Sequence, residues 1–238
     1  MAYDKSSGCA VFAVATVTLL LAIGCLGQTP SQTQPEERHQ DHSCTVDAAA
    51  TLATFALPAG EDRNNFDKAG WGLQAGGGFA VSRSAEPDRG NSWYVTANFM
   101  YEKFKANAKA LGKASSENSV LANVTSAHGS FPAVTIDPTF RHSFNRRFGF
   151  YAGGGFGWLK RSISFNGVNV TTSTLLYPNS ITLDRLASNS GVFDIGAGVN
   201  AAPGKLGGFM LFAEARVYHG LAINSGSTLV PLSLGVRW

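Results

Sequence analysis

Residues 209–219 are FMLFAEARVYH, and this stretch decides the fold. Apolar side chains occupy almost every second position from Phe209 to Val217, which is the period of a β-strand with one apolar face. Glu214 and Arg216 share the opposite face. A soluble core does not explain two opposite charges on one face of a buried strand, whereas a transmembrane barrel strand alternates between lipid and lumen. The stretch therefore predicts a membrane-spanning β-strand.

The same alternation recurs along the chain in stretches of about ten residues separated by turn residues, as in transmembrane barrels. A single-chain bacterial barrel has an even number of strands, so an eighth strand is expected before Trp71. Residues 51–59 are the only candidate, although their alternation is poor. We therefore predict an all-β fold, an eight-stranded antiparallel up-and-down transmembrane β-barrel. The other predicted strands span 71–81, 92–102, 133–141, 148–158, 191–201 and 229–238.

Large aromatic side chains lie near the ends of the apolar faces. In transmembrane barrels such residues form girdles at the two lipid–water interfaces, and a soluble β-sandwich has no need of that placement. The predicted aromatic girdle comprises Trp71, Phe79, Trp93, Phe99, Tyr101, Phe148, Phe150, Trp158 and Trp238.

Charged side chains fall on the face opposite to the apolar one. Eight strands enclose an interior just wide enough for side chains to fill, and an unpaired charge there would be costly. Carboxylates and arginines are therefore expected to pair across strands. We favour a packed polar plug that holds the barrel rigid, and a gated polar path for a small solute is the alternative. The predicted lumen charge network comprises Glu102, Asp137, Arg141, Asp194, Glu214, Arg216 and Arg237.

Glycine triplets at 76–78 and 153–155 lie within alternating strands and open no helix, so they do not predict a phosphate-binding loop. We expect such glycines to let opposite lumen side chains interdigitate or to let the strands bend. The motifs GxSxG, HExxH and GxxxxGK[ST] do not occur in the sequence. A formal net charge of +3 is too small for a nucleic-acid footprint. The sequence therefore predicts no enzyme, no nucleic-acid partner, no cofactor and no metal.

The N-terminal part of the chain differs from the rest. Residues 10–24 form an uncharged apolar run after Lys5, so residues 1–27 are predicted to be a signal peptide with cleavage after Gly27. Lipoprotein processing at Cys25 is the alternative. The polar, proline-containing segment that follows predicts a flexible linker over 28–48 and a barrel over 49–238.

The last predicted strand has apolar residues at alternate positions and a final aromatic residue. This pattern resembles the C-terminal strand of outer-membrane β-barrel proteins, in which the final aromatic is read by the barrel-insertion machinery. With the glycine-rich strands, the chain resembles the small OmpA- and OmpW-like barrels, which implies an integral outer-membrane location and the insertion machinery as a partner. The predicted insertion signal comprises Val230, Leu232, Leu234, Val236 and Trp238.

The expected function is a structural or surface-interaction role for a monomeric barrel, with outer-membrane lipid and lipopolysaccharide as partners. Lysines at the start of the 105–129 segment and at Lys103 could meet lipopolysaccharide phosphates. Three alternatives stay open. They are an OmpW-like narrow conduit for small, including hydrophobic, solutes; a lipid-modifying enzyme that would use His219 and Ser233; and a soluble lipocalin-like barrel.

Overall fold

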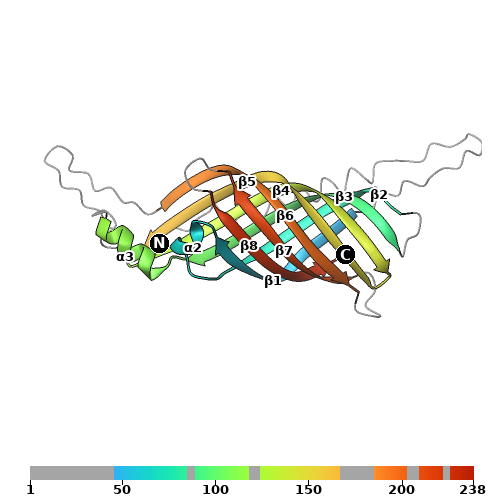
Figure 1. The fold of residues 1–238 in the computed structure, drawn as a ribbon, viewed down its shortest axis with the longest axis horizontal. Coiled ribbons are helices and arrows are strands. Elements are labelled where there is room, and N and C mark those ends of the chain that lie inside the picture. The colour runs from blue at the N-terminus through green and yellow to red at the C-terminus, as the bar shows by residue number, and fades with distance from the viewer. Residues whose placement is uncertain (1–45, 85–88, 118–123, 167–184, 203–208, 222–225) are drawn as a thin grey trace, which may run out of the picture.

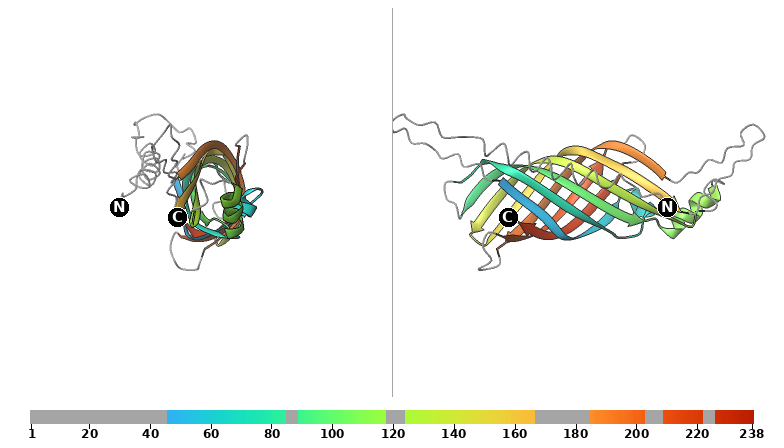
Figure 2. Two further views of the ribbon diagram at one scale, coloured as in Figure 1. Left: turned by 90° about the vertical axis from the view of Figure 1, so that its left-hand side faces the viewer. Right: turned by 180° about the vertical axis from the view of Figure 1, so that it is seen from behind.

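A computed structural model describes residues 46–84, 89–117, 124–166, 185–202, 209–221 and 226–238. Its strands form one closed antiparallel sheet in which each strand pairs with its neighbours in sequence and β1 pairs with β8. Figure 1 shows the strands tilted along the barrel, and Figure 2 shows the ring seen from one end. The predicted eight-stranded up-and-down barrel is confirmed. The strands are β1 (Val46–Ala59), β2 (Gly70–Ser82), β3 (Gly90–Lys105), β4 (Ser126–Asn145), β5 (Phe148–Asn166), β6 (Arg185–Ala201), β7 (Met210–Gly220) and β8 (Thr228–Arg237).

The two ends of the barrel differ. The last residues of β2 and β4 lie at the same end of the barrel as the C-terminus of the chain, and we call it the turn end. Two helices, α2 (Asp62–Asn65) and α3 (Ala108–Glu117), follow β1 and β3 at the opposite end, which we call the helix end (Figure 1). No helix among the described residues is long and apolar enough to cross a bilayer.

Strand β1 explains why the alternation of residues 51–59 is poor. Its register shifts against β2 between Ala50 and Thr54, and against β8 between Thr51 and Ala53. An extra residue in one strand moves every later side chain to the other face of the sheet. The buried positions are therefore odd-numbered at the start of the strand and even-numbered after the bulge, as at Asp47 and Thr54. The strand also begins at Val46, within the segment predicted as linker.

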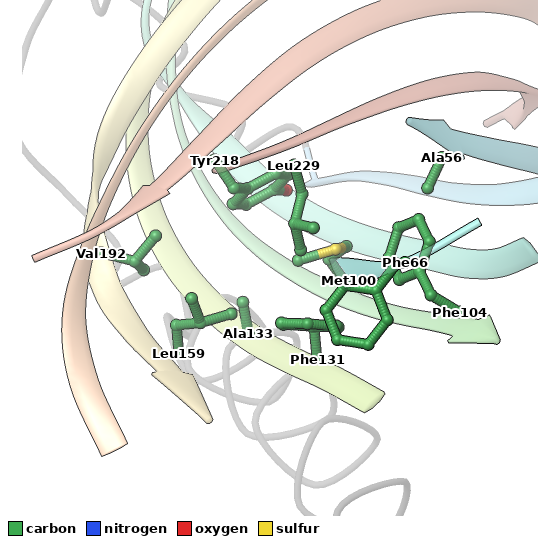
Figure 3. Close-up of a cluster of buried hydrophobic side chains, with 10 residues drawn as sticks. All are labelled: Ala56, Phe66, Met100, Phe104, Phe131, Ala133, Leu159, Val192, Tyr218 and Leu229. Carbon is green, nitrogen blue, oxygen red and sulfur yellow. The ribbon is translucent and has the colours of Figure 1, made fainter. Parts of the chain in front are cut away.

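The interior of the barrel is filled by two layers of side chains. The layer toward the helix end is an apolar cluster, which Figure 3 shows around Phe66, Phe104 and Phe131. The layer toward the turn end is charged and surrounds Arg216. The prediction of a lumen filled by polar and charged side chains is therefore wrong for the helix-end layer.

Candidate functional site: the outer apolar belt and the lumen charge network

Every strand of the barrel presents large apolar side chains on its outer face. Ile195 on β6 is 63% exposed, whereas the side chain of its neighbour Asp194 points inward and is buried. This arrangement is the reverse of that in a soluble protein, whose exposed apolar patches are limited to a few hundred Å². We call this surface the apolar belt; it includes Leu52, Phe55, Leu73, Ile136, Phe156, Ile195, Leu211 and Leu234.

Aromatic residues border the apolar belt on both sides. On β2, β3 and β5 the two bordering residues are eight positions apart, as at Trp71 and Phe79 or at Phe150 and Trp158. Eight residues span roughly 26 Å along a strand, and a tilt of about 40° reduces this to roughly 20 Å along the barrel axis. Transmembrane barrels have an outward apolar band of about 25 Å between their aromatic girdles. The spacing therefore fits the thickness of a membrane.

The residues of the predicted aromatic girdle face outward, but they are not equally exposed. Trp93 is 50% exposed and Trp158 is 44% exposed, whereas Phe99 is only 8% exposed. Phe99 lies between Ala75 of β2 and Val134 of β4, so it contacts the sheet more than the surroundings. The other members that are at least about one-third exposed are Trp71, Phe79, Phe148, Phe150 and Trp238, and Tyr101 is half-buried beside Trp71.

The predicted insertion signal occupies the outer face of β8. Val230, Leu232, Leu234, Val236 and Trp238 alternate with buried residues along this strand. Their outward placement makes the face accessible, and its recognition by an insertion machinery stays a prediction.

Arg216 on β7 is the centre of the lumen charge network. Its Nη1 donates hydrogen bonds to Oδ2 of Asp137 on β4 and to Oδ2 of Asp194 on β6. Its Nε donates to Oε1 of Glu214 at 2.8 Å. Asn98 Nδ2 also donates to Asp137, at 2.5 Å. One guanidinium therefore links three buried carboxylates from three strands.

Asp47 is the centre of a second ionic group, nearer the turn end. Its Oδ2 accepts a hydrogen bond from Arg141 Nη2 at 2.5 Å and lies 3.7 Å from Arg237 Nε. Both arginines also lie over aromatic rings, Arg141 at 3.8 Å from the ring centroid of Tyr94 and Arg237 at 4.2 Å from that of Tyr151. Such cation–π contacts compensate part of the lost hydration of a guanidinium.

The space between these ionic groups is small. Two cavities beside Arg216 and Arg237 have volumes of about 20 Å³ and about 30 Å³. A water molecule needs roughly 10–15 Å³ of such space, so each cavity has room for about one or two waters. The described side chains leave no room there for a larger solute.

Glu102 is the predicted network member that the structure separates from the others. It is 0% exposed, and the buried apolar residues Met100 and Phe104 flank it on the lumen face of β3. Neither of its carboxylate oxygens has a hydrogen-bond partner among the described residues. The alternation of β3 correctly predicts that Glu102 faces the lumen. It does not predict how far along the barrel axis the side chain lies.

The segment between β1 and β2 closes the helix end of the lumen. Phe66 lies in the apolar cluster, with its ring centroid 5.8 Å from that of Phe104 and 5.5 Å from that of Phe131 (Figure 3). Asp62 on α2 reaches across to Arg161 on β5, where Arg161 Nη2 donates to Asp62 Oδ1 at 3.0 Å. Burial raises the pKa of the Asp62 carboxyl above its ordinary value, and the charge of Arg161 partly offsets that rise.

Lumen-facing glycines lie beneath the large side chains of the network. A Cβ on Gly198 would lie 2.5 Å from the ring carbon Cζ and the hydroxyl of Tyr151, and one on Gly196 would lie 2.9 Å from Cγ of Arg216. The expectation concerns the glycine triplets, where a Cβ on Gly76 would meet Oδ1 of Asn98 and one on Gly155 would lie 2.5 Å from Oδ1 of Asp137, in agreement with interdigitation of lumen side chains.

Replacing Gly198 with alanine is expected to lower the free energy of unfolding by roughly 1–3 kcal/mol, because the added methyl group would displace the Tyr151 ring. Urea unfolding in detergent micelles measures the effect. Gly112 on α3 is the matched control, since a Cβ there would meet nothing within 4 Å. An unchanged midpoint for Gly198→Ala would show that the ring has room to move.

Sequence reasoning missed several residues of the lumen. Asp47 falls within the predicted linker, because the bulge in β1 weakens the alternation that would mark this strand. Asp62 and Arg161 lie outside the predicted strands, and their pairing depends on how the connection after β1 folds back. Asn200 on β6 accepts a hydrogen bond from Arg237 Nη1 at 2.9 Å, and the alternation of its strand gives no sign of that role.

The residue pair suggested for a lipid-modifying enzyme does not meet. Ser233 is buried in the lumen and lies within hydrogen-bond distance of Thr54, at 3.3 Å. His219 is on the outer face of β7, and its Nδ1 lies 2.8 Å from the hydroxyl of Thr228. The sheet separates the two side chains, so they cannot act as a nucleophile and its base.

Comparisons with known proteins give a likeness of fold. No protein-family model and no curated protein sequence matches the chain. Neisserial surface protein A superposes with a TM-score of 0.50 at 14% identity, over 81% of this chain and 95% of that protein. Ail of Yersinia pestis, solved with the heparin analogue sucrose octasulfate, gives a TM-score of 0.45 at 15% identity over 81% and 99% of the two chains. The N-terminal β-barrel domain of Pseudomonas aeruginosa OprF gives 0.38 at 13% identity over 81% and 96%. The chain thus has the fold of the small, OmpA-like eight-stranded barrels of the outer membrane.

Proposed function

We propose that this protein is an integral outer-membrane barrel with a structural or surface-interaction role, whose lumen is closed to solutes. The observation that carries the proposal is the apolar belt, which runs around a sheet without edges. In lipid every backbone amide needs a partner, and a closed sheet supplies one to each strand. A soluble lipocalin-like barrel would bury Trp93, Phe150 and Trp158, whereas each of them is at least 36% exposed.

The packing of the lumen supports the closed-barrel role over the OmpW-like conduit. The Arg216 and Asp47 groups occupy the charged layer, and Phe66 with its neighbours fills the layer above it. Eight strands enclose only enough space for such side chains. Recognition would then lie in the connections at the helix end, since loops on a rigid scaffold commonly carry it.

Lysines near the helix-end border of the apolar belt support a lipopolysaccharide partner. Lys103 follows Tyr101 by two positions on the outer face of β3, and Lys160 follows Trp158 in the same way on β5. Aromatic residues mark the headgroup level of a membrane, so these ammonium groups would lie at the depth of lipid phosphates. The helix end would then face the cell exterior and the turn end the periplasm.

A membrane extraction tests the location. The protein is expected to stay in the membrane pellet after a carbonate wash and to migrate differently on gels before and after boiling, because a folded barrel resists detergent. A peripheral periplasmic protein processed in parallel is the control and should be released. Release of this protein by carbonate would contradict the membrane-embedded role.

Planar-bilayer recording tests the closed lumen. The purified barrel is expected to give no reproducible conductance steps, because the described lumen cavities hold only about one or two waters each. A known porin inserted under the same conditions is the control. Regular conductance steps would favour the conduit, even if the membrane location holds.

A further inference from the structure

Six outward-facing rings form one contiguous cluster at the turn end. His142 is central: its ring centroid lies 4.7 Å from that of Phe144 and 5.5 Å from that of Phe150. Phe140 connects Phe150, at 6.0 Å, to Trp93, at 5.3 Å. We call this cluster from β3, β4 and β5 the turn-end patch; its members are Trp93, Phe140, His142, Phe144, Phe148 and Phe150.

The turn-end patch is more than an ordinary part of a girdle. Elsewhere on the outer face, Phe209 contacts Trp238 and Phe193 contacts His219, each as a pair of rings. A girdle needs rings at one depth, but it does not need them to touch. Contact among the six rings instead makes a continuous aromatic surface on one side of the barrel.

Cationic residues border the turn-end patch on two sides. Arg146 and Arg147 form the turn between β4 and β5, and both are exposed. Asn145 Oδ1 accepts hydrogen bonds from the backbone N–H of Arg147 at 2.8 Å and of Phe148 at 2.9 Å, so the turn has a defined shape. Arg89 is also exposed and precedes Gly90, which pairs with Ser143 beside Phe144.

The outer faces of β3, β4 and β5 carry no acidic side chain among the described residues, and Glu86 and Asp88 of the connection after β2 lie outside those residues. Among the described residues of β3, β4 and β5, the acidic side chains are Glu102 and Asp137, and both are buried in the lumen. His142 Nδ1 is held 2.7 Å from Asn91 Oδ1, so the ring keeps its place in the patch. The turn-end patch therefore combines a continuous aromatic surface with positively charged side chains at its border.

We propose that the turn-end patch binds the headgroup of an anionic phospholipid. The inference rests on the proposed membrane-embedded role, which puts the rings at the boundary of acyl chains and headgroups. The turn arginines lie just beyond that boundary, at the level of the lipid phosphate. A guanidinium binds phosphate through two parallel N–H donors, and a basic patch at this depth favours anionic over zwitterionic lipid.

The experiment compares lipids retained by the full-length protein. Purified protein is placed in bilayers of phosphatidylcholine and phosphatidylglycerol, extracted with mild detergent and examined by native mass spectrometry. The wild type is expected to retain phosphatidylglycerol in preference to phosphatidylcholine. Arg147→Gln is expected to lower that preference roughly five-fold. Arg89→Gln, which removes an exposed guanidinium beside the neighbouring strand, provides an independent variant if Arg147→Gln folds poorly.

Two control variants test whether the lipid preference depends on the turn-end patch, and not on any positive charge or any aromatic ring of the protein. Arg63→Gln removes one positive charge from the exposed side of α2 at the other end of the barrel, and Phe209→Leu removes a ring from an isolated pair. Both should retain wild-type preference, whereas Phe144→Leu should reduce it. An equal preference in wild type and in the arginine variants would overturn the inference. Protein that fails to float with any vesicle would overturn the membrane-embedded role instead.

Discussion

Replacing Arg216 with alanine is expected to lower the free energy of unfolding by roughly 3–5 kcal/mol, the cost of removing one partner from a buried ionic group. The variant would leave Asp137, Asp194 and Glu214 close together in the lumen without the guanidinium that links them. Urea unfolding in detergent micelles, followed by the gel shift between folded and boiled protein, measures the loss.

Two further variants help to interpret the stability loss of Arg216→Ala. Arg63→Ala removes an exposed cation of α2 and should change stability by no more than about 0.5 kcal/mol. Arg216→Ala combined with Asp194→Asn should recover part of the loss, because one of the uncompensated charges is then gone. Unchanged stability for Arg216→Ala, together with new conductance in a bilayer, would favour a gated path over a packed plug.

Replacing Ile195 with arginine is expected to cost roughly 2–4 kcal/mol in a lipid bilayer, as a cation does at the midplane of a transmembrane barrel. Ile195 pairs with Gly154, which is midway between the two bordering aromatics of β5, Phe150 and Trp158. For a soluble protein, the same change at a position 63% exposed would be nearly neutral. Denaturant titration in phosphatidylcholine vesicles measures the difference.

Asn189→Arg is the matched control on the same strand. Asn189 is exposed on the outer face of β6 and pairs with Lys160, beyond the bordering aromatic Trp158. Its cost is expected to be about 0–1 kcal/mol, because a cation near the interface stays hydrated. Equal effects at Ile195 and Asn189 would show that the apolar belt does not lie in hydrocarbon.

The faces of most strands could be predicted from the sequence, because the side-chain period of a strand is a local property. Ile195 and Asp194 point to opposite sides whatever the partners of β6 are. The same logic failed where a bulge changes the period. In β1 the face switches between Ala50 and Thr54, so alternation was weak there and Asp47 was missed.

Which lumen residues meet could not be predicted, because partners across a barrel depend on strand tilt and stagger around the whole ring. Arg216 contacts Asp137 from a strand three places away around the sheet, and no sequence spacing encodes that contact. Glu102 has the same alternation as the network residues, yet its height places it among apolar side chains.

The sequence by itself determined that the strands alternate between an apolar and a polar face. It also determined that aromatic residues border the apolar face and that charged residues and glycines share the polar face. Only the tertiary structure decided the heights of those charges, the two ionic groups of Arg216 and Asp47, and the closure of the helix end by Phe66. The reason is that the face on which a side chain lies depends on its neighbours along one strand. Its position along the barrel axis and its contacts depend on how eight strands close into a ring.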